Sequence, residues 1–246
     1  MFRRLEAVEV VEPLSVLFGE FRRRDGSPWV MLNIVESVDG ATALSGGASA
    51  LNDADDRELF LALRAVADVV LVGAQTVRSE GLGPVRMSAE MLEHRARAGL
   101  EGEPRLAILS RSLNIDPDHR VFSDPMRRPI VVAPTNADPH RLDRIAEKAD
   151  IVGVDTDRSE AIIDALAPAQ VILCEGGPSV NSLLIAAGVV DEINLTISPI
   201  LGLGQSKRVA SDHFELNPYQ KLVLDRTWTG DHSLFLRYIR ESDSST

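Results

Sequence analysis

The sequence predicts an α/β protein whose mostly parallel central sheet is flanked by helices and extended by antiparallel strands near the C-terminus. Short apolar runs of strand type recur between segments with helical periodicity. Several of these runs are apolar at consecutive positions, as expected of parallel strands that are covered on both faces. After residue 191, strand runs alternate with turns and no helix intervenes, which predicts the antiparallel extension.

Runs rich in Val, Ile and Leu define the predicted strands. The first six are residues 29–35, 68–73, 105–110, 129–133, 150–154 and 170–175. Three more follow at residues 192–201, 221–228 and 233–239, and a turn joins the last two. Helices between the early runs are expected to cover both faces of the sheet.

The clearest predicted helix covers residues 53–67, with Asp53 as its N-cap. One stripe of this helix is apolar and consists of Leu59, Phe60, Leu63 and Val66. Shorter helices are predicted at residues 139–148, 158–165 and 178–187, and the last of these has Pro178 at its start and Gly188 after its end. The polar stretch 81–102 predicts a loop and a surface helix over an active site.

Length and composition predict one folded domain over residues 1–246. Its core is expected at about 29–240, after an N-terminal extension (1–28) and before a frayed tail (241–246). The 26 basic and 37 acidic residues give a formal charge of −11, which disfavours nucleic acid and anionic membranes as partners. The only cysteine, Cys174, permits no intrachain disulfide and fits a cytoplasmic protein. The five histidines show no metal-binding spacing, so no metal site is expected.

The strongest local motif is a buried strand that runs into Gly176 and Gly177 and then into a helix beginning with Pro178 and Ser179. Two glycines allow a phosphate to approach the backbone closely, and a helix start offers free N–H donors. The motif therefore predicts a diphosphate-binding turn, although an ordinary strand-to-helix turn has the same pattern.

Two other strand ends carry similar chemistry. Gly73 is followed by Thr76 at a helix start, and Ser110 and Arg111 after residues 105–109 could hold a phosphate monoester such as the 2′-phosphate of NADP. Because the carboxyl ends of parallel strands meet at one edge of a sheet, we expect these groups to converge on a nucleotide cofactor.

An ordered set of motifs resembles the riboflavin-biosynthesis pyrimidine reductase family, best known as the C-terminal half of bifunctional deaminase-reductases. The matching segments are Asn33–Ala43, Leu63–Asp68, Val72–Glu80, Ser110–Arg111, Glu175–Pro178, Leu183–Glu192 and Ser198–Gly202. The zinc deaminase half has no counterpart, because no HxE motif is accompanied by PCxxC and one cysteine could not supply it. The chain therefore resembles a stand-alone form of the reductase.

The resemblance implies a dihydrofolate-reductase-like fold, NADPH as cofactor and a homodimer. The implied reaction is hydride transfer to C1′ of 5-amino-6-(5-phosphoribosylamino)uracil, a small-molecule substrate, which converts its ribosyl group to ribityl. Matching positions imply a cofactor site that includes Gly73, Thr76, Glu80, Ser110, Gly177 and Pro178; the strand-end motifs add Arg111, Gly176 and Ser179.

Substrate-binding positions implied by the resemblance are Asn33, Arg64, Glu175 and, with a one-residue shift, Arg86. Glu175 is the first candidate for a catalytic carboxylate. Asp39 is the second, although Asp-Gly pairs also form ordinary turns. Lys207 and Arg208 either contact the substrate phosphate or belong to a connection between strands.

Departures from the family pattern fall on the substrate side. Deaminase-linked members usually carry lysine where Asn33 stands, a basic residue at Ala41, and serine and tryptophan near Ala48 and Ala50. A less polar lining leaves an NADPH-dependent dihydrofolate or pterin reductase as the second hypothesis. A dinucleotide-binding protein without turnover is the third.

Overall fold

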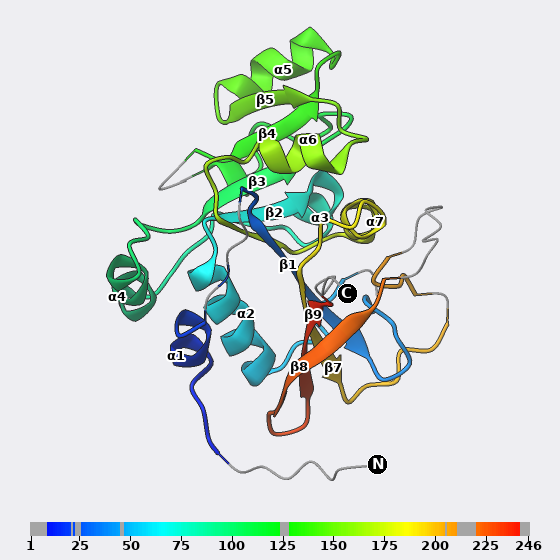
Figure 1. The fold of residues 1–246 in the computed structure, drawn as a ribbon. Helices are drawn as coiled ribbons and strands as arrows, with labels where there is room; N and C mark the ends of the chain where they lie inside the picture. The colour runs from blue at the N-terminus through cyan, green and yellow to red at the C-terminus, as the bar shows by residue number, and fades with distance from the viewer. Residues whose placement is uncertain are drawn as a thin grey trace, which may run out of the picture.

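The computed structural model describes residues 9–20, 22, 26–44, 47–123, 128–204, 206–210 and 220–241 (Figure 1). Their nine strands form one sheet in the order β5-β4-β3-β2-β6-β1-β7-β9-β8. The strands are β1 (Trp29–Ser37), β2 (Val69–Gly73), β3 (Arg105–Leu109), β4 (Ile130–Pro134), β5 (Asp150–Val154), β6 (Val171–Cys174), β7 (Glu192–Ser198), β8 (Leu222–Thr229) and β9 (Leu234–Arg240).

In this order the strands from β5 to β7 are all parallel to one another. Strand β9 runs antiparallel to both of its neighbours, β7 and β8. This arrangement confirms the predicted class, and each predicted strand is present. The helices are α1 (Pro13–Phe18), α2 (Ala54–Val66), α3 (Ala74–Ser79), α4 (Ala89–Arg97), α5 (Pro139–Ala146), α6 (Ser159–Asp164) and α7 (Pro178–Ala186).

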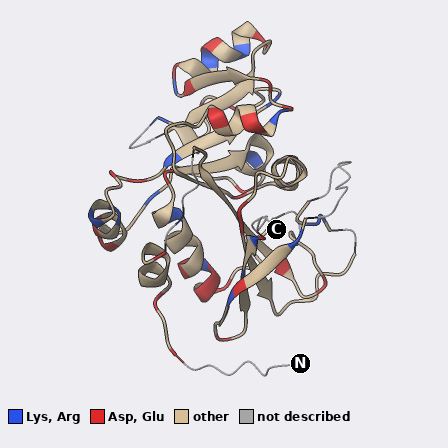
Figure 2. Cartoon of the chain, viewed as in Figure 1, with Lys and Arg blue, Asp and Glu red and all other residues tan. Residues whose placement is uncertain are grey.

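Helices cover both faces of the parallel strands, as predicted. On one face, α6 and α7 pack on β1, β2, β3, β4 and β6. On the other, α3 and α5 cover β2, β3 and β4, and α1 and α2 cover β1 and β6. Figure 2 shows that charged residues lie mainly on helices and loops, while β2, β3 and β4 are almost free of them. The apolar strands therefore have both faces buried.

Helix α2 begins as predicted, with the Asp53 carboxylate accepting a hydrogen bond from the Asp56 amide at 2.7 Å. Leu59, Leu63 and Val66 are buried. Phe60, which was predicted on the same stripe, is only half-buried and lines the cavity described below. The helix thus faces both the core and the cavity.

Helix α4 packs against α2 through a buried arginine. Arg95 is 1% exposed and donates hydrogen bonds to the carbonyl oxygens of Ala65 (2.7 Å) and Ala67 (2.6 Å) at the end of α2. It thereby satisfies carbonyls that the helix end leaves unpaired. The predicted position of this helix over an active site is wrong, since Leu82 alone of residues 81–102 lines the cavity.

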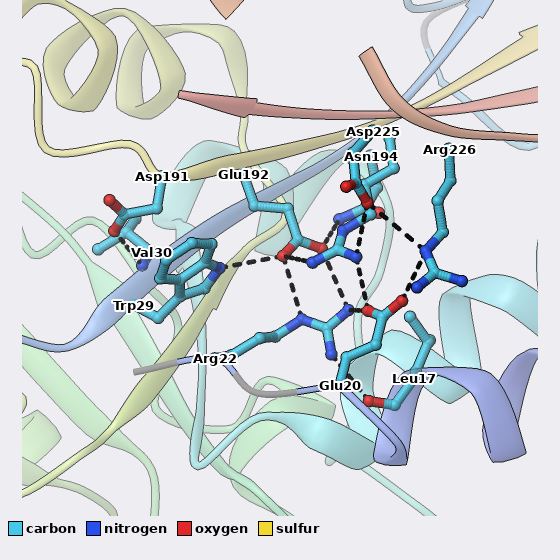
Figure 3. Close-up of polar contacts among 11 residues, drawn as sticks. Leu17, Glu20, Arg22, Trp29, Val30, Asp191, Glu192, Asn194, Asp225 and Arg226 are labelled. Atoms are coloured by element: carbon cyan, nitrogen blue, oxygen red, sulfur yellow. Dashed lines mark hydrogen bonds and ion pairs between the residues drawn. The ribbon is translucent and has the colours of Figure 1, made fainter. Parts of the chain in front are cut away.

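Described residues of the predicted N-terminal extension (1–28) pack against the core. Leu17 is 1% exposed in the cluster beneath α2. Glu192 of β7 is fully buried and accepts hydrogen bonds from Arg22 (3.0 Å), Trp29 (3.0 Å) and Arg237 (2.9 Å), as Figure 3 shows in part. The predicted tail lies outside the described residues except at Glu241.

Cys174 lies in the core, where burial raises the pKa of its thiol to about 12. A thiol in that state is unreactive, as expected of a buried cysteine in an apolar strand. Within the described ranges, every helix is too short or too polar to cross a bilayer.

Candidate active site

A cavity of about 1160 Å³ opens at the carboxyl edge of the parallel strands. Residues 33–35 in the middle of β1 and residues at the ends of β2, β3 and β6 line it, together with residues from α2, α3, α7 and the segment after β7. Gly73, Ser110 and Gly177 are all among them. The three strand ends expected to converge therefore do so, at the edge where open α/β sheets bind ligands.

Most predicted site residues line this cavity. They are Asn33, Gly73, Thr76, Glu80, Ser110, Arg111, Glu175, Gly176, Gly177, Pro178 and Ser179. Three others do not: Asp39, Arg64 and Arg86 lie outside the lining.

Close packing explains the glycines at the ends of β2 and β6. The Gly73 amide donates to the Gly176 carbonyl oxygen at 2.7 Å. A Cβ on Gly73 would lie 3.0 Å from Val180, and one on Gly177 would lie 2.8 Å from the Thr76 hydroxyl. The Gly176–Gly177 peptide bond is cis, and Gly176 has φ +85°. Side chains here would displace one wall of the cavity.

The start of α7 offers backbone donors to a ligand. Gly177 is the N-cap of this helix and supplies no side-chain cap, and Pro178 stands in the first turn. The amides of such a turn, together with the helix dipole, favour an anion. The Thr76 hydroxyl lies against Gly177, so it can donate to the same group.

Ser110 carries an unpaired polar atom at the end of β3. The residue is 2% exposed, and its hydroxyl has no hydrogen-bond partner in the described part of the chain. A buried hydroxyl without a partner is unfavourable, so a ligand in the cavity would stabilise it by supplying the missing hydrogen bond. Arg111 beside it is about half exposed and lies 3.6 Å from Asp157. Backbone donors at a helix start, a hydroxyl without a partner and a half-exposed cation fit the phosphates of a dinucleotide.

Glu175 is held by a two-point contact with Arg64. The guanidinium donates from Nε to Oε1 at 2.6 Å and from its terminal nitrogen to Oε2 at 2.7 Å. The side chains are 13% and 8% exposed, and Arg64 also stacks 4.1 Å from the centre of the Phe60 ring. Arg64 therefore orients Glu175 at the cavity wall and does not itself reach the cavity.

Asp39 anchors a loop instead of facing the cavity. Its carboxylate accepts hydrogen bonds from the Ser37 hydroxyl (2.5 Å) and from the amides of Gly202 (2.8 Å) and Leu203 (2.9 Å). These bonds, that of Ser37 foremost, lower the pKa of Asp39 to about 2. Because Gly202 and Leu203 line the cavity, this geometry favours a positioning role over the predicted catalytic one.

Arg86 lies away from the cavity. Its guanidinium is 3.8 Å from the carboxylate of Glu103, which precedes β3 and so belongs to the opposite edge of the sheet. The structure therefore places Arg86 outside the cavity in which the contact with a substrate phosphate was expected.

Asp56 is a cavity residue that the sequence interpretation missed. It is 5% exposed in the first turn of α2, and burial is the main reason that the pKa of its carboxyl is raised. A helix start rich in Asp favoured a capping role for all its acids. The spacing of Asp56, Leu59 and Leu63 could have indicated its burial, because it puts Asp56 on the same face of the helix as the apolar residues.

Comparisons with known proteins agree on one family. Residues 28–235 match the family described as the RibD C-terminal domain. A 2,5-diamino-6-ribosylamino-4(3H)-pyrimidinone 5′-phosphate reductase of Methanothermobacter thermautotrophicus is 25% identical over 219 residues, which is 86% of this chain and 97% of that protein. The reductase of the same name from Archaeoglobus fulgidus is 26% identical over 75% of this chain and 86% of its own length.

A solved structure shares the fold over nearly the whole chain. It is a pyrimidine reductase-like protein of Corynebacterium diphtheriae, with a TM-score of 0.80 and 26% identity. The match covers 95% of this chain and all of that one. The RibD protein of Mycobacterium tuberculosis is 25% identical over 73% of this chain but only 44% of its own length, so this chain corresponds to one part of it.

Proposed function

Because this chain belongs to the RibD C-terminal domain family, we propose that it is an NADPH-dependent reductase that converts the ribosyl group of a phosphorylated ribosylaminopyrimidine to ribityl. The observation that supports this proposal is that Gly73, Ser110, Gly177 and the buried carboxyl of Asp56 all line the same cavity. It supplies phosphate-binding groups at one end and a proton-holding group at the other.

In this proposal the cofactor occupies the half of the cavity formed by β2, β3, β6, α3 and α7. Gly176, Gly177 and the start of α7 bind its diphosphate, with Thr76 as a further donor. Ser110 and Arg111 bind the 2′-phosphate. When bound, NADPH supplies the hydride.

The substrate lies in the other half, beside β1 and α2. Reduction of the open-chain C1′=N bond places a hydride on C1′ and a proton on the attached nitrogen. Asp56 is suited to hold that proton, because its raised pKa preserves the protonated carboxyl to higher pH. Both oxygens of Glu175 accept from Arg64, so we assign Glu175 the orientation of bound ligands. Asn33, at the cavity wall, offers an amide to the pyrimidine.

The test is a steady-state assay that follows the loss of NADPH absorbance. Two substrates are compared: the diaminopyrimidinone 5′-phosphate in the relatives' names, and its deaminated uracil counterpart, which the sequence resemblance implied. We expect saturable oxidation with at least one, and preferentially with the diaminopyrimidinone, because relatives of nearly equal length carry that name. Binding of NADPH without turnover on either substrate would reject the proposal.

The same assay separates the two alternatives. Turnover of dihydrofolate or another dihydropterin, with none of a ribosylaminopyrimidine, would favour the pterin reductase. Saturable oxidation with any substrate would remove the hypothesis of a dinucleotide-binding protein without turnover.

Arg111→Ala is expected to weaken NADPH binding roughly 10-fold or more and NADH binding much less, because a guanidinium–phosphate contact contributes about 1.5–3 kcal/mol. Dissociation constants for the two cofactors, measured by fluorescence titration, check this. Equal weakening of both would show that Arg111 does not contact a 2′-phosphate.

We also infer a homodimer that uses the edge strand β8. Leu222, Val223 and Leu224 are 37%, 49% and 50% exposed on this strand, and no strand of the described residues pairs with its outer edge. Exposed apolar edge strands favour association with another strand. Light scattering on the wild type and on Val223→Lys, which should dissociate the dimer, tests the assignment.

A cytoplasmic location stays a prediction.

A further inference from the structure

The cationic side chains of the cavity fall into two groups. Among the described residues, the Lys and Arg side chains that line it are Arg57, Arg78, Arg111 and Lys207. Arg78, on α3, and Arg111, after β3, belong to the cofactor half, and Arg78 donates to the Asn114 carbonyl oxygen at 2.6 Å. Arg57 comes from α2, and the Lys207 carbonyl oxygen accepts from Thr42 shortly after β1, so we assign both residues to the substrate half.

We propose that Arg57 and Lys207 bind the 5′-phosphate of the substrate. The inference rests on the proposed function, and it assigns residues that differ from the arginine implied by the family resemblance. Both side chains are exposed at the cavity, and neither forms an ion pair within the described ranges. In a chain of net charge −11, a phosphate must be held by such local cations.

The chemistry of the two side chains is complementary. The Arg57 guanidinium presents a planar set of N–H donors that can contact two phosphate oxygens at once. Lys207 adds a compact charge on a flexible stem. Its own backbone is fixed, because the Lys207 carbonyl oxygen accepts from the amide (3.0 Å) and the hydroxyl (2.9 Å) of Thr42, another cavity residue. The backbone of Lys207 is thus held at the cavity wall, and its side chain remains available to a ligand.

The other candidate cations lie outside the lining of the cavity. Arg86 pairs with Glu103 ahead of β3 and lies outside the lining. Arg208 also lies outside it and faces Glu36, where its positive charge opposes the rise that burial causes in the pKa of that carboxyl. Of the two basic residues that the sequence placed after Gly204, only Lys207 therefore reaches the cavity.

This assignment also fixes the direction of the substrate. Asp56 is buried and Asn33 is half-buried, whereas Arg57 and Lys207 are exposed. The pyrimidine would therefore enter first, toward Asp56, and the phosphate would remain at the rim. A dianion held there keeps part of its hydration, so its desolvation penalty is smaller than in the interior.

The experiment compares phosphorylated and dephosphorylated ligands. The ratio of kcat/KM for the ribosylaminopyrimidine 5′-phosphate to that for its dephosphorylated form is measured in the wild type, Arg57→Gln, Lys207→Gln and the double variant. Binding of ribose 5-phosphate and of ribose is measured by calorimetry with NADP⁺ saturating, so that the cofactor half is filled. Arg144→Gln, on the remote helix α5, is the control for loss of one positive charge.

Each single substitution is expected to lower the kcat/KM ratio roughly 10-fold and to weaken ribose 5-phosphate binding by a similar factor, since a charged hydrogen bond is lost. Arg144→Gln and Arg86→Gln should retain the wild-type ratio. An unchanged ratio in the double variant, or an equal fall in Arg86→Gln, would overturn the assignment. A wild type that oxidises NADPH with neither substrate would contradict the proposed function instead, and ribose 5-phosphate binding would still decide the phosphate site.

Discussion

Asp56→Asn is expected to lower kcat by roughly 10²–10⁴-fold while leaving NADPH binding nearly unchanged. General acid catalysis contributes about that factor, and an amide cannot transfer the proton that the carboxyl holds. Asp56 lies on α2, away from the strand ends that would bind the cofactor, so cofactor affinity should be retained. Stopped-flow hydride transfer and a fluorescence titration with NADPH measure the two quantities.

Two further readouts separate a catalytic role of Asp56 from a structural one. Burial raises the pKa of Asp56 in the folded state, so the wild-type rate should fall as pH rises through that pKa. The rate of Asp56→Asn should not show this decrease. The folded state retains this proton to higher pH than the unfolded state, so the wild type loses stability as pH rises. Asp56→Asn should therefore be more stable than the wild type at neutral pH, but not in acid.

Glu58→Gln provides the matched control for Asp56, because Glu58 is an exposed acid on the same helix. Its rate should stay within a factor of about two of the wild-type rate, as expected for an exposed charge. If Asp56→Asn retained a rate that close to wild type, the proton would have to come from another group.

Glu192→Gln should destabilise the protein by about 3–5 kcal/mol, because it removes the buried carboxylate that neutralises Arg22 and Arg237. Arg22 and Arg237 have side chains only 3% and 5% exposed, and Glu192 also accepts from Trp29 and Asn194 (Figure 3). Two buried guanidiniums would then share the remaining acids of the network. Urea unfolding followed by fluorescence measures the loss.

The decrease in stability at low pH gives a second test of the role of Glu192. Burial alone would raise the pKa of Glu192, but the Arg22 and Arg237 charges outweigh it and hold that pKa below its usual value. The stabilisation by ionised Glu192 is thus complete above the pKa of an unfolded glutamate and is lost as pH falls through the lower folded pKa. The variant should lack this part of the wild-type decline in acid.

Asp225→Asn tests the rim of the same network. Asp225 accepts from Arg237 at 3.0 Å, but its side chain is 35% exposed, so its removal should cost less than about 1 kcal/mol. Similar losses in Asp225→Asn and Glu192→Gln would show that burial of the Glu192 pair adds little.

Most strands and the site motifs at their ends could be predicted because their signals are local. Short apolar runs, a capping Asp53 and a glycine pair each act within a few residues of their own position. Once the strands are parallel, their carboxyl ends must share an edge, and this rule alone placed Gly73, Ser110 and Gly177 together.

Roles that depend on a distant partner were not predictable in this way. Arg64 matched a family position near the substrate, yet its contact is Glu175, which is 111 residues away in the chain. Residues 1–28 were predicted as an extension ahead of the core, and nothing near Arg22 indicated that it donates to Glu192, which is 170 residues away. Neither pairing has a signature in the residues beside it.

The sequence by itself determined the sheet, its helices and the edge at which the cavity opens, because backbone propensity and periodicity depend on neighbouring residues. The tertiary structure alone decided which charged groups meet: Asp56 faces the cavity, Asp39 holds a loop, and Arg86 points to the opposite edge. The physical reason is that burial and ion pairing are set by whatever the fold brings within a few ångströms, and the chain order does not encode that distance locally.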